Sequence, residues 1–232
     1  MVEIKGLEKF SPRDYPGVIS SSMFLGSCNF RCPFCHNAEL VLNPDDLPTF
    51  PMDYITDFLD SRKDWLEGIC ITGGEPLLHP DLADFLFLLK ERELLVKLDT
   101  NGSFPSRLED LIAKNLVDSI AMDVKAPLEE YEKVTRTVVD VKNIRKSIDI
   151  IKHSGVDYMF RITAVPGLID EAGMKEIGRM LQGARIFQIQ QFVPENTLDP
   201  ACERLKPFKR EEMRALGQSV EGFFSEVRIE EA

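Results

Sequence analysis

Three cysteines lie close together near the start of the chain, in the stretch "SCNFRCPFCHN" (27–37). Cys28, Cys32 and Cys35 follow the spacing C-x3-C-x2-C. Thiolates at such spacing can form a redox dithiol, part of a zinc site, or three ligands of an iron–sulfur cluster. The choice among these three chemistries decides most of the functional interpretation.

The spacing of the cysteines favours the cluster. A redox dithiol would use only a C-x-x-C pair and would leave Cys28 without a role. A structural zinc site needs four ligands, but Cys70 and Cys202 are isolated and no second C-x2-C pair exists. His36 directly follows Cys35 and is poorly placed to complete a tetrahedron with it. A [4Fe–4S] cluster held by three thiolates, with its fourth iron open to a small ligand, is therefore the preferred interpretation, and the other two remain alternatives.

A second motif, "ITGGEP" (71–76), combines two glycines with a carboxylate. Gly73 and Gly74 permit unusual φ values and leave backbone N–H and C=O groups accessible. Glu75 offers a fixed anion for an ammonium group. A tight turn after a strand would explain the glycines alone, but it would not explain the carboxylate.

The elements that must position these residues alternate along the chain between short apolar runs and amphipathic segments. Strands are expected at 18–26, 68–72, 94–100, 118–125, 158–165, 185–192 and 226–230. Helices are expected at 52–67, 81–93, 106–115, 141–155, 171–183 and 209–224. Repeated strand–helix units predict a parallel sheet with helices packed outside it. We expect a single α/β domain over 1–232 that forms a partial, open (β/α)6 barrel, with a flat doubly wound sheet as the alternative.

Polar motifs follow or end these strands. They are "LGSC" (25–28), "TGGE" (72–75), "DTNG" (99–102), "MDVK" (122–125) and "FRIT" (160–163). Loops at the carboxyl ends of parallel strands converge on one site in β/α folds. The sequence therefore predicts one active site assembled from several strand ends, with the cluster loop at 26–37.

The amino-acid composition limits the kinds of partner that the chain can be expected to bind. The chain has 232 residues, 44% of them hydrophobic, and a formal net charge of −11, with a pI near 4.9. An acidic surface repels phosphate backbones, so nucleic acid is not expected as a partner. No run of 18 apolar residues and no signal-peptide pattern are present, so we expect a cytoplasmic protein without a membrane partner.

The cysteine motif with an aromatic residue before its last cysteine (Phe34), followed by GGE at the end of the next strand, resembles the radical S-adenosylmethionine enzymes. This resemblance implies that Cys28, Cys32 and Cys35 hold a [4Fe–4S] cluster. It also implies that the amino and carboxylate groups of S-adenosylmethionine bind the fourth iron, and that the GGE segment holds the amino group.

Longer stretches are similar to the activating enzymes of glycyl-radical enzymes, from about residue 4 to 230. These stretches are 14–40, "TGGEPLL" (72–78), "DTNG" (99–102), "MDVKAP" (122–127), "RITAVPGLID" (161–170) and "QQFVPENTLDP" (190–200). Activases of anaerobic ribonucleoside-triphosphate reductase look most similar, and pyruvate formate-lyase activase is a near relative. The resemblance implies a partial TIM-like barrel of the radical S-adenosylmethionine type.

The resemblance also implies a role in cofactor or cation binding for residues at matching positions. Backbone around Phe34 and His36 would lie against the adenine, and Gly73, Gly74 and Glu75 would hold the methionyl end. Asp99, Thr100 and Asp123, with the carbonyl of Ala121, match a monovalent-cation site beside the methionyl carboxylate. Lys125 and Arg161 would reach the cofactor from the fourth and fifth strands.

The implied reaction is reductive cleavage of S-adenosylmethionine, followed by removal of a hydrogen from a glycine Cα of a partner. The expected partner is a glycyl-radical enzyme, with the large subunit of anaerobic ribonucleotide reductase preferred and a pyruvate formate-lyase type as the alternative. An electron donor such as flavodoxin or ferredoxin is also implied. A radical enzyme that modifies a small molecule or RNA, and a zinc-binding adaptor that is not an enzyme, are the alternatives from other classes.

The sequence departs from the family pattern at several points. Ser27 stands where a glycine commonly precedes the first cysteine, and "QQFVPEN" (190–196) lacks the Pro-x-His of the formate-lyase activase. No further cysteine cluster is present, which favours a simple activase over a multi-cluster enzyme. Of the isolated cysteines, Cys70 is expected in the core and Cys202 at the surface.

Overall fold

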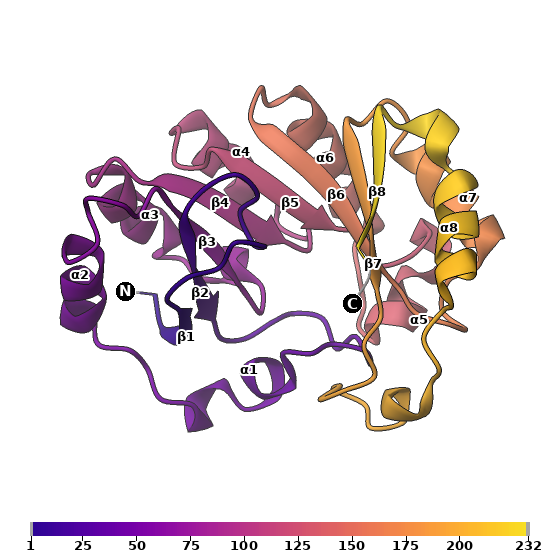
Figure 1. The fold of residues 1–232 in the computed structure, drawn as a ribbon, viewed down its shortest axis with the longest axis horizontal. Coiled ribbons are helices and arrows are strands. Elements are labelled where there is room, and N and C mark those ends of the chain that lie inside the picture. The colour runs from indigo at the N-terminus through magenta and orange to yellow at the C-terminus, as the bar shows by residue number, and fades with distance from the viewer. Residues whose placement is uncertain (1, 231–232) are drawn as a thin grey trace. The chain divides into compact units, whose positions relative to one another are not determined.

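The computed structural model describes residues 2–230 (Figure 1). The chain forms two compact units. The first comprises Met1–Asn29, Glu39–Thr100 and Ser106–Ile120, and the second comprises Phe30–Ala38, Asn101–Pro105 and Ala121–Ala232. The single-domain organisation expected for 1–232 stays a prediction.

The strands within residues 2–230 follow one another in the sheet in the order of the chain. They are β1 (Ile4–Glu8), β2 (Ser20–Leu25), β3 (Gly68–Gly73), β4 (Leu95–Thr100), β5 (Ser119–Asp123), β6 (Asp157–Ala164), β7 (Ile186–Gln191) and β8 (Glu226–Glu230). Strand β1 is antiparallel to β2, whereas β2, β3 and β4 are parallel, as are β6, β7 and β8. The predicted partial, open (β/α) barrel is confirmed, and the flat doubly wound alternative is not needed.

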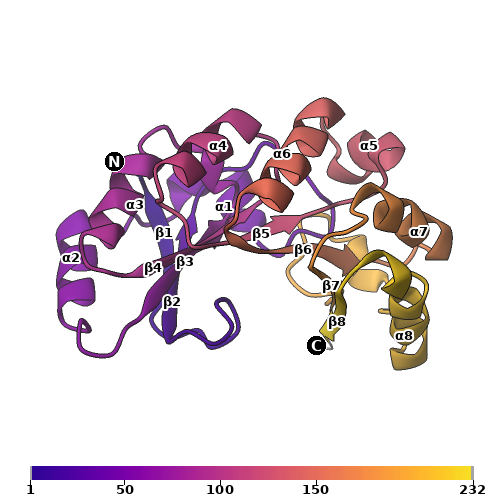
Figure 2. The ribbon, with the colours of Figure 1, turned by 90° about the horizontal axis from the view of Figure 1, so that it is seen from above.

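Three helices cover one face of the strands of the first unit (Figure 2): α2 (Met52–Asp60), α3 (Leu82–Lys90) and α4 (Pro105–Ala113). The short helix α1 (Ala38–Leu42) follows the cysteine loop, and short 3-10 turns lie at Pro44–Asp46 and Pro76–Leu78. Alternation along a strand gives the two faces different chemistry. Ile69 and Ile71 on β3 share one face and are fully buried, whereas Cys70 and Thr72 share the other face. The apolar side chains of α3 require the apolar face, so the polar positions of the strands point away from the helices.

The second unit repeats this layering (Figure 2). Its helices are α5 (Tyr131–Thr135), α6 (Val141–His153), α7 (Glu171–Met180) and α8 (Arg210–Gln218), with 3-10 turns at Leu128–Glu130, Cys202–Arg204 and Glu221–Phe223. Carboxylates set two helix starts: Asp140 accepts from Lys142 N at 3.0 Å, and Asp170 accepts from Gly173 N at 2.9 Å. Gly155, with φ of +74°, follows the end of α6 and is the residue type that this left-handed position favours.

Two helices are shorter than the sequence predicts. Helix α2 ends at Asp60 rather than near residue 67, because the chain must reverse before β3 starts at Gly68. Arg62 lies in that reversal and stacks on Phe58 and Trp65 with distances of 4.5 and 5.2 Å to the ring centroids. Helix α8 ends at Gln218 and passes into a 3-10 turn.

Three short elements were not predicted: β1, α1 and α5, each of five residues. Segments this short carry too few residues for a hydrophobic period to be recognised. No helix within residues 2–230 is long and apolar enough to cross a membrane.

Candidate active site

In the first unit, the cysteine loop begins where β2 ends at Leu25. Ser27 has φ of +65°, a left-handed conformation that costs a non-glycine residue about 1–2 kcal/mol. Two backbone hydrogen bonds hold it there: Ser27 N donates to Leu40 O at 2.8 Å, and Glu75 N donates to Ser27 O at 2.8 Å. The half-buried Cys28 follows directly. A glycine before the first cysteine would adopt this backbone without strain, which explains the family preference from which Ser27 departs.

The two glycines of the GGE motif are required by close backbone packing. Gly73 has φ of +109°, and a Cβ there would lie 2.6 Å from the carbonyl oxygen of Leu25. A Cβ on Gly74 would overlap the carbonyl oxygen of Ser27, far inside any contact distance. The backbone that leaves β3 therefore packs directly against the backbone that leaves β2, its parallel neighbour, at a point where no side chain fits. This close packing fixes the start of the cysteine loop against Glu75.

Glu75 is fully buried. Its Oε1 accepts from Leu77 N at 3.1 Å and from Thr100 Oγ1 at 2.8 Å. These bonds set the orientation of a carboxylate that burial would otherwise disfavour. The structure thus brings together two predicted site residues, Glu75 and Thr100, in one hydrogen bond.

Asp99 lies one residue before Thr100 at the end of β4 and is 8% exposed. Its Oδ2 accepts from Thr72 Oγ1 at 3.3 Å. Its Oδ1 is paired with the ammonium group of Lys97, which is 1% exposed. The ammonium group of Lys97 therefore lies beside Asp99, which was predicted as a ligand of a monovalent cation.

In the second unit, Cys32 and Cys35 stand at the two ends of a tight turn. Cys35 N donates to Cys32 O at 3.1 Å, and Pro33 and Phe34 form the middle of the turn. Leu198 N donates to Cys35 O at 3.0 Å. Cys32 is buried and Cys35 is half-buried. The turn thus holds two thiols in a fixed backbone frame.

A cation–carboxylate group lies beside these two thiols. Lys125 Nζ is 3.2 Å from Asp123 Oδ2, and Arg161 Nε donates to Asp123 Oδ1 at 2.8 Å. Burial acts to lower the pKa of Lys125. The negative charges of Asp123 and of the Cys32 and Cys35 thiolates outweigh that effect, and the pKa of this lysine is raised. Lys125 therefore remains an ammonium group, placed where negative charge on the cysteine sulfurs is stabilised.

The same group controls the ionisation of Asp123. Burial acts to raise the pKa of its carboxyl, but the charges and hydrogen bonds of Arg161 and Lys125 outweigh it and hold that pKa well below its usual range. Tyr131 OH accepts from Lys125 N at 3.2 Å, and the Tyr131 ring meets Phe30 edge-on at 6.4 Å between centroids. These contacts fix the backbone that carries Lys125.

Phe34 and His36 lie on either side of Cys35. Phe34 is buried, at 5% exposed, and the His36 ring meets Phe192 edge-on at 6.3 Å between centroids. Burial lowers the pKa of His36, and Glu195 only partly opposes this effect. His36 is therefore uncharged near pH 7, which suits an apolar surface for a flat ring.

The structure tests the predicted burial of the two isolated cysteines. Cys70 is fully buried, so its predicted core position is confirmed. The prediction for Cys202 was wrong: its side chain is buried, at 7% exposed, because the 3-10 turn Cys202–Arg204 folds the thiol inward. Burial raises the pKa of this thiol.

Two side chains near the predicted residues were missed by sequence analysis. Lys97 is one, and the signal for it is a lysine inside an otherwise apolar strand, two residues before Asp99. Tyr131 is the other, and no sequence pattern marks it, because its contacts join residues from separate segments.

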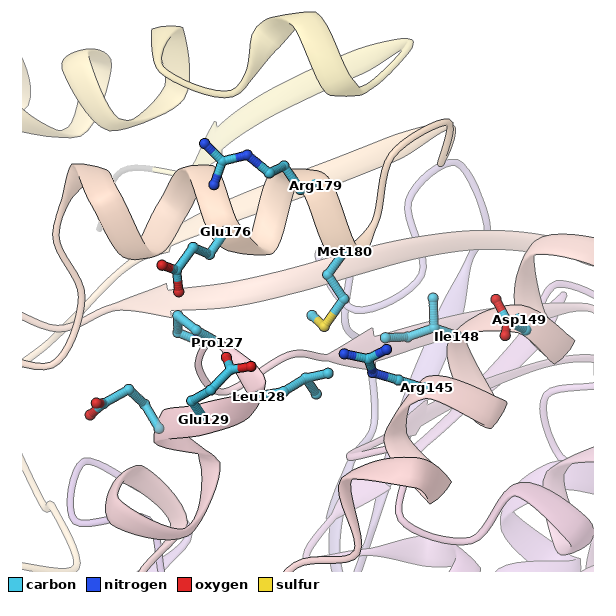
Figure 3. A pocket seen from close by; sticks show the side chains of 10 residues that line it. Pro127, Leu128, Glu129, Arg145, Ile148, Asp149, Glu176, Arg179 and Met180 are labelled. Atoms are coloured by element: carbon cyan, nitrogen blue, oxygen red, sulfur yellow. The ribbon is translucent and has the colours of Figure 1, made fainter.

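The second unit also carries an open groove of about 760 Å³ that contains none of the predicted site residues (Figure 3). It is lined by Pro127, Leu128, Glu129, Glu130, Arg145, Ile148, Asp149, Glu176, Arg179 and Met180. Its rim mixes both signs of charge over an apolar floor, so its shape and charge do not single out one ligand.

Comparison with known proteins adds the decisive observation. The family model described as the Radical SAM superfamily matches residues 23–177, which span the cysteine loop, the GGE segment and the Lys125–Asp123–Arg161 group. The chain belongs to the radical SAM superfamily. It is therefore a radical SAM enzyme, and membership implies a [4Fe–4S] cluster and S-adenosylmethionine as cofactors.

Two relatives cover most of the chain. A protein of Methanocaldococcus jannaschii, named as a candidate glycyl-radical enzyme activating enzyme, is 33% identical over 97% of this chain and 95% of its own length. The pyruvate formate-lyase-activating enzyme of Streptococcus mutans is 26% identical over 84% of this chain and 78% of its own length.

Two solved structures share the fold of this chain. The crystal structure of Streptococcus suis SuiB matches 91% of this chain and 48% of SuiB with a TM-score of 0.67, at 15% sequence identity. A structure of SuiB bound to S-adenosylmethionine matches with a TM-score of 0.66, at 16% identity over 89% of this chain and 48% of that one. At these identities the likeness shows the fold alone.

The close packing of the GGE segment predicts a large effect of a single methyl group. Gly74→Ala places a Cβ on the carbonyl oxygen of Ser27, so we expect the free energy of unfolding to fall by about 3 kcal/mol. Gly222→Ala is the matched control, because a Cβ there has no atom within 4 Å, and its effect should stay within about 0.5 kcal/mol. Urea unfolding of the two variants, with the thiols kept reduced, measures both. Equal stabilities would contradict the close packing of Gly74 on Ser27.

The ion pairs of Asp123 predict a pH-dependent contribution to stability. Because its folded-state pKa is depressed, the contribution is fully present above the unfolded carboxyl pKa of about 3.9 and is lost as the pH falls towards the folded value. We expect Asp123→Asn to reduce the free energy of unfolding by about 1–3 kcal/mol near pH 7.

This difference from the unmodified protein should shrink as the pH falls below about 4. Unfolding of the cofactor-free protein across pH measures it, with the exposed Asp64→Asn as the control. A difference that grew towards low pH would show that Asp123 is not stabilised as a carboxylate.

Proposed function

We propose that this protein is an activating enzyme of a glycyl-radical enzyme, with the large subunit of anaerobic ribonucleoside-triphosphate reductase as its partner. In this role it reductively cleaves S-adenosylmethionine and leaves a radical on a glycine Cα of the partner. The observation that carries the activating role is the 33% identity to the M. jannaschii protein over nearly the whole of both chains, and the choice of the reductase as partner rests on the resemblance of the sequence motifs. Similarity over the full length includes the segments outside the superfamily core.

The cluster ligands in this proposal are Cys28, Cys32 and Cys35. The chemistry of the donor set fits: three cysteines in one short loop, two of them in a backbone turn beside Lys125. Thiolate-bound iron–sulfur clusters carry net negative charge, and a nearby ammonium group stabilises it. Zinc, the alternative occupant, would require a fourth protein ligand.

The S-adenosylmethionine contacts in this proposal are divided among several residues. Glu75 holds the amino group, with Gly73 and Gly74 giving the backbone access that it needs. Backbone around Phe34 and His36 lies against the adenine, next to a buried aromatic ring and an uncharged imidazole. The remaining proposed contacts are Asp99, Thr100, Asp123, Lys125 and Arg161.

With its cofactors bound, a radical SAM site supplies one-electron cleavage of the sulfur–C5′ bond, giving methionine and an adenosyl radical that takes a hydrogen atom from the substrate. The residues of this chain bind and orient. The buried Glu75 holds a fixed direction through Leu77 N and Thr100, so an ammonium group bound to it is held in one place. Buried aromatic surface around the cysteine turn excludes water and competing hydrogen donors.

Activation of a pyruvate formate-lyase type enzyme is the second candidate. It is favoured by the similarity to the S. mutans enzyme, whose name states that activity. Both candidates share the same chemistry and differ only in the partner. A one-electron donor of the flavodoxin or ferredoxin type is required by either.

Cofactor cleavage can be tested with cysteine variants. Protein reconstituted anaerobically with iron and sulfide, then supplied with dithionite and S-adenosylmethionine, should form 5′-deoxyadenosine that chromatography detects. We expect Cys32→Ala to reduce product to the level without enzyme, because a cluster ligand is lost. Cys202→Ala removes a buried thiol outside the motif and should retain product. A colourless protein with about one bound zinc and no product would contradict the proposal.

The partner can be tested by electron paramagnetic resonance. After the same reduction, addition of an anaerobic reductase large subunit should give the signal of a glycyl radical, and replacement of its radical glycine by alanine should remove that signal. A signal only with a pyruvate formate-lyase type enzyme would select the second candidate. 5′-Deoxyadenosine without a radical on either protein would overturn the activase role but leave the radical SAM chemistry in place.

A further inference from the structure

A buried lysine beside a predicted cation ligand is not accounted for by the proposed function. Lys97 lies on β4 and is 1% exposed. Its ammonium group pairs with Asp99 and lies 3.7 Å from Cys70 Sγ. Lysine is almost never fully buried unless it is paired. The pairing with Asp99 is therefore the reason that this side chain can stay inside the unit.

Strand geometry holds the lysine in place. Lys97 and Asp99 are two residues apart on one strand, so both side chains leave the same face of the sheet. Cys70 stands directly opposite Lys97 in the parallel register of β3 and β4. The ammonium group thus reaches Asp99 along one face of the sheet, beside Cys70 of β3.

The residues expected to bind a monovalent cation do not fit that task. Asp99 already has the charge of Lys97 beside it, and the Thr100 hydroxyl donates to Glu75. In the second unit, Asp123 is paired with Arg161 and Lys125. A metal cation brought next to Asp99 would meet the like charge of Lys97 in a site where water screens little. Each carboxylate of the expected cation site thus has a protein cation as its partner.

We propose that the ammonium group of Lys97 takes the place of a monovalent metal cation at Asp99, so that this site binds none. Lys97 is then a positioning residue: it sets the charge and direction of Asp99. For cofactor cleavage the consequence is independence from sodium and potassium, and that consequence rests on the proposed function. The binding claim itself concerns only side chains of the first unit.

The unmodified enzyme gives the first test. Formation of 5′-deoxyadenosine is compared in potassium, sodium and tetramethylammonium chloride at one ionic strength of about 0.1 M. We expect the three rates to agree within about twofold. A rate that fell by about tenfold in tetramethylammonium would overturn the proposal, because it would show that a small cation is required.

A variant without the lysine charge should require a small cation from solution. Lys97→Met keeps the length of the stem but deletes the charge, and it leaves room for a small cation beside Asp99. We expect product to fall by about tenfold in tetramethylammonium and to recover in potassium, sodium or ammonium. Lys90→Met is the matched control, because Lys90 forms a 2.7 Å ion pair with Asp118 in the same unit away from the predicted site. If the ion pair is purely structural, its loss should lower the stability of either variant, and product formation should not depend on the cation. That result for Lys97→Met would contradict the proposal.

Melting of the cofactor-free protein separates this inference from the proposed function. The unmodified protein should melt at the same temperature in potassium and in tetramethylammonium, whereas Lys97→Met should melt about 2 °C or more higher in potassium. If no protein forms 5′-deoxyadenosine, the proposed function fails while melting still decides the role of Lys97. If Lys97→Met does not fold, Lys97→Gln takes its place, and the unmodified protein still tests whether the site binds a cation. Stabilisation of the unmodified protein by potassium over tetramethylammonium would overturn the inference.

Discussion

The close backbone packing at the ends of the parallel strands β2 and β3 is the constraint on which the first unit's chemistry depends. Gly74 packs directly on the carbonyl of Ser27, and that same carbonyl accepts a hydrogen bond from Glu75 N. The start of the cysteine loop and the GGE carboxylate therefore cannot move independently. Ser27 keeps a left-handed backbone that costs energy, and hydrogen bonds to Leu40 O and from Glu75 N hold it there. The first cysteine of the motif and the GGE segment are thus joined in one packing arrangement within the first unit.

Compensation of buried charge is the second constraint. Each acidic side chain singled out at the strand ends has a polar or cationic partner: Thr100 for Glu75, Lys97 for Asp99, and Arg161 with Lys125 for Asp123. A carboxylate in such surroundings would otherwise shift towards its protonated form. Because the partners belong to the chain itself, the charges are set before any cofactor binds, and a bound cofactor meets groups of defined direction.

The order of the elements and the positions of the site motifs could be predicted from the sequence. The order of strands and helices follows from hydrophobic periodicity, and the motifs at the strand ends follow from the geometry of parallel sheets. The reversal after Asp60 and the inward turn of Cys202 were not predicted, because each depends on where the next element must start or pack. The need for Gly74 was attributed to backbone access, whereas the structure shows that the deciding factor is steric exclusion by Ser27. A single sequence cannot show which two backbones approach each other so closely.

Lys97 is a residue whose role the resemblance to known sequences does not predict. A resemblance transfers the ligands of a cation site by position, but it does not transfer the neighbours that decide whether those ligands are already paired. The lysine side chain reaches Asp99 only because both leave the same face of β4 and Cys70 stands opposite in β3. Had the lysine been one position earlier or later, alternation would have turned it to the apolar face, where an ammonium group has no partner. The register of a single strand therefore decides whether the charge beside Asp99 belongs to the protein or must come from solution.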